Sequence, residues 1–159
     1  MNRKLKIGRR EEGNCTWLTL KGIIDENSDF KEAFSDLKEN VVIDLEGIDL
    51  INSCGVREWV QAMQKLPLNS KILFVRCSPR IVEQINYVAN FLGRGSVDSF
   101  YVPYFCSKCK KETNVLLTVK EMEKSRPIKA PPEKCLICKG SLEFDDIEEE
   151  YFSFLEESK

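Results

Sequence analysis

The sequence predicts an α/β protein with a mixed, mostly parallel sheet, followed by a small β module built around four cysteines. Apolar runs of strand length, such as Val41–Leu45 and Lys71–Arg76, alternate with segments whose apolar residues recur at helical spacing. Such alternation favours parallel pairing through crossover helices. Two Cys-x-x-Cys pairs lie in the last third of the chain. We therefore expect residues 1–102 to form the α/β domain and residues 103–159 to form the cysteine module.

The N-terminal part is expected to contribute the antiparallel edge of the sheet. Leu5–Ile7 and Cys15–Leu20 have strand character and are separated by a polar turn, so they predict a hairpin. A helix is then expected, with Ser28 as its N-cap and acidic residues in its first turn. Its apolar face would consist of Phe30, Ala33, Phe34 and Leu37.

The centre of the chain changes from strand to helix periodicity within a few residues. The buried strand at Val41–Leu45 leads through a loop to Ser53, after which a helix is expected. The apolar face of that helix would consist of Val56, Trp59, Val60, Met63 and Leu66. In open α/β sheets, ligands and partners bind beyond the carboxyl ends of strands, where the first N–H groups of helices are unpaired. Ser53 is therefore placed at a candidate functional junction.

A second strand and helix follow, and they complete the predicted sheet. Lys71–Arg76 is a further buried strand, and Ser78-Pro79 has the N-cap and first-position proline of a helix start. The last strand of this part is expected at Val97–Val102. The core face of the helix would consist of Ile81, Val82, Ile85, Val88, Ala89 and Leu92.

The strand with Asp44, the loop and the sequence Asn52-Ser53-Cys54-Gly55 resemble the middle of the STAS domain of the bacterial anti-sigma-factor-antagonist type. That family has an apolar strand ending in aspartate, a short loop, and Asp-Ser-Ser-Gly leading into a helix. Leu20–Phe30 is similar to the segment of that family in which a strand is followed by Gly-x-x-Asp and leads into the first helix. The resemblance covers residues 1–102. Asn52 replaces the usual aspartate and Cys54 the second serine.

The resemblance implies that Ser53 is a phosphoacceptor and that the surrounding residues bind a protein partner. The partner would resemble an anti-sigma factor with serine-kinase activity. From the residues alone, Ser53 could instead be an N-cap that accepts a bond from an early helix N–H. Cys54 is expected to be a small, buried or half-buried residue, because the chain has no histidine to act as its base. The candidate partner-binding residues are Asn52, Ser53, Cys54, Gly55 and Arg57.

The two cysteine pairs predict a metal site. Each Cys-x-x-Cys turn can direct two sulfurs at one ion, so two turns complete a tetrahedron. The candidate ligands are Cys106, Cys109, Cys135 and Cys138. Zn²⁺ in a zinc ribbon is the expected occupant, with iron as the alternative. Four cysteine ligands leave no position for an activated water, so the site is expected to be structural. Val115–Val119 and Ser141–Phe144 would supply the ribbon strands.

Two segments of the second module allow alternative interpretations. Glu121–Glu133 is charged and proline-rich, which is typical of a solvated loop or of an arm that contacts a partner. Further on, the acidic C-terminal helix would place four apolar residues on one face. It would either pack on the rest of the chain or dock a partner. The four residues are Ile147, Tyr151, Phe154 and Leu155.

Composition excludes several functional classes. The chain has 24 basic and 26 acidic residues, no histidine, and no glycine-rich phosphate loop, so we expect a protein that is not an enzyme. It lacks a secretory signal and any apolar run of the roughly 18 to 20 residues that span a membrane, so a cytoplasmic protein without membrane contact is expected. Charge is nevertheless uneven. Residues 101–140 carry nine basic and four acidic groups, whereas residues 141–159 carry one and eight.

Two functions follow from these observations. The first is a non-catalytic bacterial regulator of transcription that binds a protein partner and is switched by phosphorylation of Ser53. The second is an adaptor that binds nucleic acid through the basic ribbon, residues 101–140. The second is less favoured because no aromatic residues interleave with the basic ones as a base-stacking surface requires.

Overall fold

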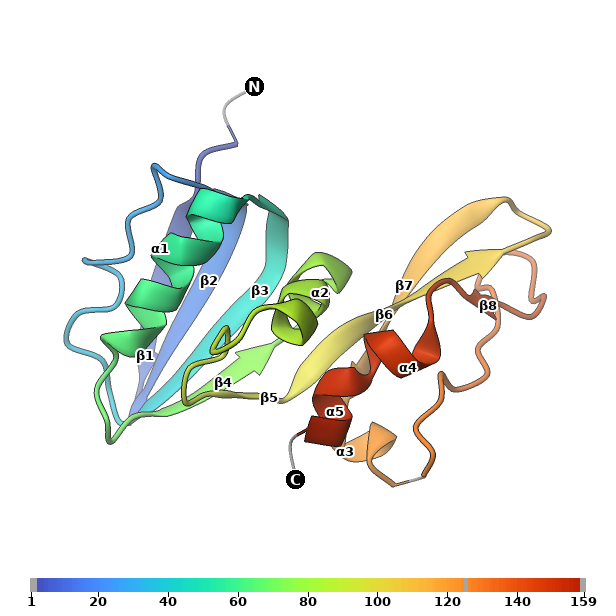
Figure 1. Cartoon of the computed structure of the whole chain (residues 1–159). Coiled ribbons are helices and arrows are strands. Elements are labelled where there is room, and N and C mark those ends of the chain that lie inside the picture. Colours follow the sequence, from blue (N-terminus) through green and yellow to red (C-terminus); the bar gives the residue numbers. More distant parts are fainter. Residues whose placement is uncertain (1–2, 125, 158–159) are drawn as a thin grey trace.

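A five-stranded mixed sheet forms the first part of the chain in the computed structural model, which describes residues 3–124 and 126–157. The strand order is β1-β2-β3-β4-β5, with β1 antiparallel to β2 and the remaining pairs parallel (Figure 1). The predicted α/β fold with a mostly parallel sheet is therefore confirmed. The strands are β1 (Lys6–Glu12), β2 (Cys15–Ile24), β3 (Asn40–Ile51), β4 (Lys71–Val75) and β5 (Ser96–Val97).

Two helices, α1 (Ser53–Gln64) and α2 (Pro79–Tyr87), cover one face of this sheet (Figure 1). The alternate residues of the strands that face these helices are buried, as the period of two along a strand requires. On the opposite face Leu73 keeps 40% of its surface exposed, and Lys21 is exposed as well. The sheet is thus covered on one side, and its other side is open among the described residues.

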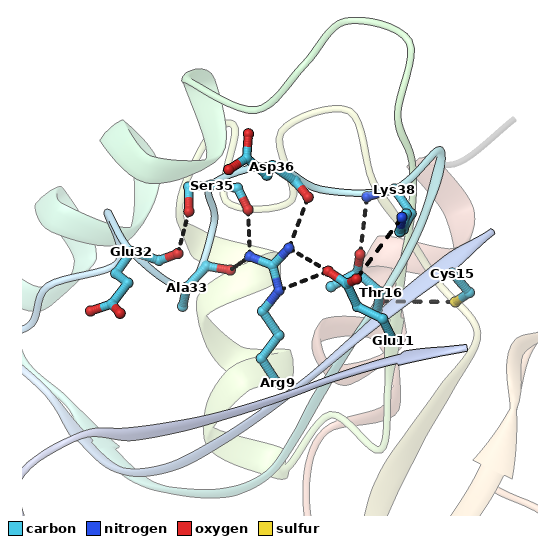
Figure 2. Close-up of polar contacts among 9 residues, drawn as sticks. All are labelled: Arg9, Glu11, Cys15, Thr16, Glu32, Ala33, Ser35, Asp36 and Lys38. Atoms are coloured by element: carbon cyan, nitrogen blue, oxygen red, sulfur yellow. Dashed lines mark hydrogen bonds and ion pairs between the residues drawn. The ribbon is translucent and has the colours of Figure 1, made fainter. Parts of the chain in front are cut away.

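Residues 28–37 do not form the expected helix, and they follow a series of turns instead. Figure 2 shows the reason. The guanidinium of Arg9 donates to the backbone carbonyls of Ala33 (3.2 Å), Ser35 and Asp36 (2.8 Å). Asp36 also has φ +49°, a left-handed conformation that interrupts a right-handed helix. The segment is held by a side chain from β1, 24 to 27 residues away, which local periodicity does not reveal.

The start of α2 agrees with the sequence, whereas its end does not. Ser78 is the N-cap, its hydroxyl accepts a hydrogen bond from the Ile81 N–H, and Pro79 is the first helical residue. The helix ends at Tyr87. The expected face members Val88, Ala89 and Leu92 therefore lie beyond the helix, although Val88 and Leu92 still pack against the core.

A second, antiparallel sheet has the order β7-β6-β8 and is formed by β6 (Ser99–Cys106), β7 (Lys111–Thr118) and β8 (Glu143–Phe144). The strand expected at Val97–Val102 is divided in two, and its second part continues to Cys106. β6 begins beside the end of β4, where the Tyr101 N–H donates to the Cys77 carbonyl (2.8 Å). It then becomes the central strand of the second sheet, so one continuous strand crosses the boundary predicted after Val102.

The C-terminal segment forms two short helices, α4 (Glu148–Tyr151) and α5 (Ser153–Glu157), rather than one. They pack on the chain, in agreement with the packing interpretation. Phe154 lies edge-on to Phe100 of β6, with ring centroids 5.1 Å apart. The Asn86 side chain of α2 donates to the Tyr151 carbonyl (3.0 Å) and accepts from the Phe154 N–H (3.0 Å). Ile147, which was expected on the buried face, is 55% exposed because it precedes α4.

The proline-rich segment Glu121–Glu133 starts within the last residues of α3 (Val119–Met122) and continues as an irregular chain. Residue 125 lies outside the described residues. Ile128 is buried, and the Tyr104 hydroxyl donates to the Pro131 carbonyl (2.5 Å). These contacts anchor the segment at two points, so it is not an entirely solvated loop.

Within the described part of the chain, no helix is both long enough and apolar enough to cross a membrane.

Candidate functional site

The start of α1 is organised by Asn52 and not by Ser53. Asn52 has extended backbone angles, and its side-chain oxygen accepts a hydrogen bond from the Gly55 N–H (2.7 Å). The expected N-cap role of Ser53 is therefore wrong, because Asn52 fulfils it. Ser53 is the first helical residue, and its hydroxyl makes no hydrogen bond to any residue that the structure describes. The residue that replaces the family's aspartate thus performs the capping itself.

Gly55 fixes the position of the helix start against the sheet. A Cβ atom at residue 55 would lie 2.1 Å from the backbone oxygen of Ile24, far below any van der Waals contact. The N–H of Asn52 also donates to that oxygen (3.2 Å). Only glycine permits this close approach of α1 to the end of β2. The glycine of the motif is thereby explained by packing.

The side chains around Ser53 form an exposed surface. Asn52, Ser53, Cys54 and Arg57 are exposed, whereas Gly55 is buried beneath them. The expectation of a buried or half-buried Cys54 is wrong, since its place in the first helical turn directs it away from the sheet. Whether these residues bind a partner stays a prediction.

The electrostatic environment of this surface combines a helix N-terminus with one nearby carboxylate. The first turn of α1 contains no acidic residue, so the partial positive charge of its N–H groups is not neutralised from within the helix. The Asn52 amide donates to the Glu26 carboxylate (3.1 Å). A hydrogen bond from its own backbone N–H and the one from Asn52 hold the pKa of Glu26 below its ordinary value.

The four predicted metal ligands converge at the far end of the second sheet. All four sulfur atoms lie within 4.8 Å of one another, and none is in a disulfide. The Sγ atoms of Cys106 and Cys138 are 3.5 Å apart, and those of Cys109 and Cys135 are 3.8 Å apart. A tetrahedron with metal–sulfur bonds of about 2.3 Å has edges of about 3.8 Å. The cluster can therefore hold a metal ion.

Two turns of the same shape present these sulfurs. Lys110 and Lys139 each follow the second cysteine of a pair and have left-handed backbones, with φ +57° and +64°. The Lys110 N–H donates to the Cys106 carbonyl (2.8 Å), and the Lys139 N–H donates to the Cys135 carbonyl (2.9 Å). The left-handed residue of the second turn is thus Lys139, directly before Gly140.

Backbone N–H groups at these turns favour the thiolate form of two of the four cysteines, Cys135 and Cys106. Hydrogen bonds from the Cys138 and Ile137 N–H groups lower the pKa of Cys135 to about 6. The Cys109 N–H, 3.4 Å from the Cys106 sulfur, lowers the pKa of Cys106 in the same way. The donor set and its surroundings fit a thiophilic ion such as Zn²⁺.

One polar cluster was not predicted from the sequence. Asp44, the aspartate of the strand in the family resemblance, forms an ion pair with Arg76 on the open face of the sheet. Arg76 also contacts Glu46 (2.9 Å), which accepts a hydrogen bond from Tyr101. The hydrogen bond to Asp44 raises the pKa of Arg76 above its ordinary value. Arg76 closes the cluster from a left-handed position, φ +51°, which the strand pattern gave no reason to expect.

Comparison with solved structures finds distant structural likenesses. The crystal structure of an anti-sigma factor antagonist from Mycobacterium paratuberculosis aligns with a TM-score of 0.45 and 17% sequence identity, over 54% of this chain and 78% of that chain. No family model matches the sequence, and no curated protein matches it. The likeness is too distant to assign roles to individual residues.

Proposed function

We propose that this chain is a non-catalytic regulatory protein that binds a protein partner through the surface at the start of α1. The observation that carries the proposal is the exposure of Ser53 in the first turn of a helix that Asn52 and Gly55 fix against the sheet. A rigid, exposed helix start with a free hydroxyl offers a partner a well-defined surface. It also corresponds to the motif by which the sequence resembles anti-sigma-factor antagonists.

Phosphorylation of Ser53 would switch this surface. A phosphate adds about −1.5 to −2 charge and sits favourably at a helix N-terminus. Arg57 lies four residues further along the same helix face, within reach of a phosphate on Ser53. Arg57 is exposed, and it forms no ion pair with any described residue. The modification would therefore both add charge to the surface and engage its exposed arginine.

The partner would resemble an anti-sigma factor that phosphorylates serine, and the role would be control of transcription by partner exchange. The cysteine cluster would hold Zn²⁺ as a structural ion, with Cys106, Cys109, Cys135 and Cys138 as ligands. The ion would cross-link the two cysteine turns. It would not take part in catalysis, since thiolates fill all four of its coordination positions.

Capture of partners from a lysate of the native host tests the proposal. Wild-type chain is expected to retain a protein that Ser53→Asp retains at least about tenfold less, because the carboxylate brings a charge onto the binding surface. Gln64→Glu is the matched control, since Gln64 is an exposed residue at the other end of α1. Equal retention by all three chains would show that the start of α1 is not the binding surface.

A further inference from the structure

The turn between Cys135 and Cys138 carries two aliphatic side chains that the fold leaves in solvent. Leu136 is 95% exposed and Ile137 is 68% exposed. The turn lies at the end of the second sheet that points away from the five-stranded sheet (Figure 1). The backbone contacts of the cysteine turns hold these residues in place, so their exposure is a property of a constrained tip.

Lysines surround this aliphatic tip. Residues 107–111 and 134–140 contain Lys108, Lys110, Lys111, Lys134 and Lys139 and no acidic residue. All five lysines are exposed, and none forms an ion pair within the described residues.

The two turns form one surface. The aliphatic stem of Lys108, from the first turn, passes over Gly140 of the second, where its Cδ atom is 3.3 Å from the position of an added Cβ. Zinc with four thiolates has a formal charge of −2. Glu112 and Glu133 lie beside the two turns, so the five lysines leave this end of the molecule with a small net positive charge, formally +1.

We propose that this tip, Leu136 and Ile137 with the five surrounding lysines, binds the surface of an anionic lipid bilayer. A bilayer provides acyl chains that can take up two aliphatic side chains beneath headgroups that attract lysine. A convex tip of this composition can enter such a soft interface directly. The proposal rests on residues other than those at the start of α1 and is independent of the partner-binding function.

Nucleic acid fits the same lysines less well. Phosphate contacts would use the charges but would leave Leu136 and Ile137 in water, and bases stack on aromatic rings rather than on aliphatic chains. Neither turn contains an aromatic residue. The aliphatic pair therefore distinguishes a lipid surface from a nucleic acid, although both are anionic.

Sedimentation of the full metal-loaded chain with lipid vesicles tests the proposal. Binding is expected to vesicles of phosphatidylglycerol mixed with phosphatidylcholine and not to phosphatidylcholine alone. The double variant Leu136→Ser/Ile137→Ser is expected to bind the mixed vesicles at least about tenfold more weakly. Leu68→Ser is the matched control, because Leu68 is 83% exposed in a loop outside the cysteine turns. It should bind within about twofold of wild type.

A second pair of variants covers the case in which the double serine variant loses its metal. Lys134→Gln and Lys139→Gln are each expected to weaken vesicle binding about fivefold, and added salt should weaken it further. Absence of wild-type binding to the mixed vesicles would overturn the proposal. It would also be overturned if Leu68→Ser lost as much binding as the tip variant, or if DNA or RNA were bound and vesicles were not.

Discussion

Replacement of Cys135 by serine is expected to abolish stoichiometric metal binding and to lower the midpoint of thermal unfolding by at least about 10 °C. Structural zinc sites contribute on the order of 10 kcal/mol to folding, and a chain of this size loses about 2 to 4 °C per kcal/mol. Cys135 is buried, and its sulfur lies 3.8 Å from that of Cys109. Serine cannot supply a thiolate, so two turns would lose their cross-link.

Metal content and the unfolding midpoint of the two chains can be measured on the same samples. Cys15→Ser is the matched control, because Cys15 is half-buried on β2 and is not among the clustered cysteines. It should retain the metal and melt within about 2 °C of wild type. Full metal retention by Cys135→Ser, or unchanged melting of a metal-free chain, would contradict the structural role of the site.

The loss of metal is expected to affect the five-stranded part as well. One continuous hydrophobic cluster extends from Leu18 to Leu155, and β6 of the second sheet hydrogen-bonds to the chain just after β4, at Cys77. Both tryptophans, Trp17 and Trp59, lie in the first part of the chain. Tryptophan fluorescence therefore follows that part alone. A fluorescence transition that stays in place after metal removal would show instead that the two parts unfold independently.

Trp59→Ala is expected to lower the free energy of unfolding by about 3 to 5 kcal/mol, the usual cost of truncating a buried aromatic residue. The indole is completely buried, and its N–H donates to the Phe91 carbonyl (2.8 Å). Truncation would leave a cavity among aromatic rings and an unpaired carbonyl. The surrounding rings, with centroids 5.5 to 6.4 Å away, belong to Phe30, Phe34, Phe74 and Phe91.

Denaturant unfolding followed by far-ultraviolet circular dichroism measures this effect without relying on the removed fluorophore. Trp17→Ala is the matched control, because Trp17 is only partly buried on the open face, where it lies beneath Arg10. It should cost no more than about 1 kcal/mol. Similar losses for the two tryptophans would mean that Trp59 is not the centre of the core.

Local sequence patterns predicted the features that depend on neighbouring residues. The strand at residues 41–45, the Ser78-Pro79 start of α2 and the four clustered cysteines all follow from short-range periodicity or spacing. The turns at residues 28–37 could not be predicted in this way, since they depend on Arg9 from β1.

In the candidate site, too, some features follow from local sequence patterns and others depend on contacts between distant segments. The motif located the start of α1, but the choice of Asn52 over Ser53 as N-cap depends on how closely the chain approaches Ile24 at the end of β2. The extension of β6 to Cys106 likewise depends on its pairing with β7 along its whole length. Both are tertiary relationships between segments far apart in the sequence.

The phosphate content of Ser53 in two fractions of the same preparation tests the central claim most directly. Tagged full chain would be isolated from the native host and separated into a partner-bound and a free fraction, and peptides containing Ser53 would be quantified by mass spectrometry. The proposed switch predicts phosphate on Ser53 in the free fraction and unmodified Ser53 in the bound one. Equal occupancy in both fractions, or no phosphate in either, would contradict it.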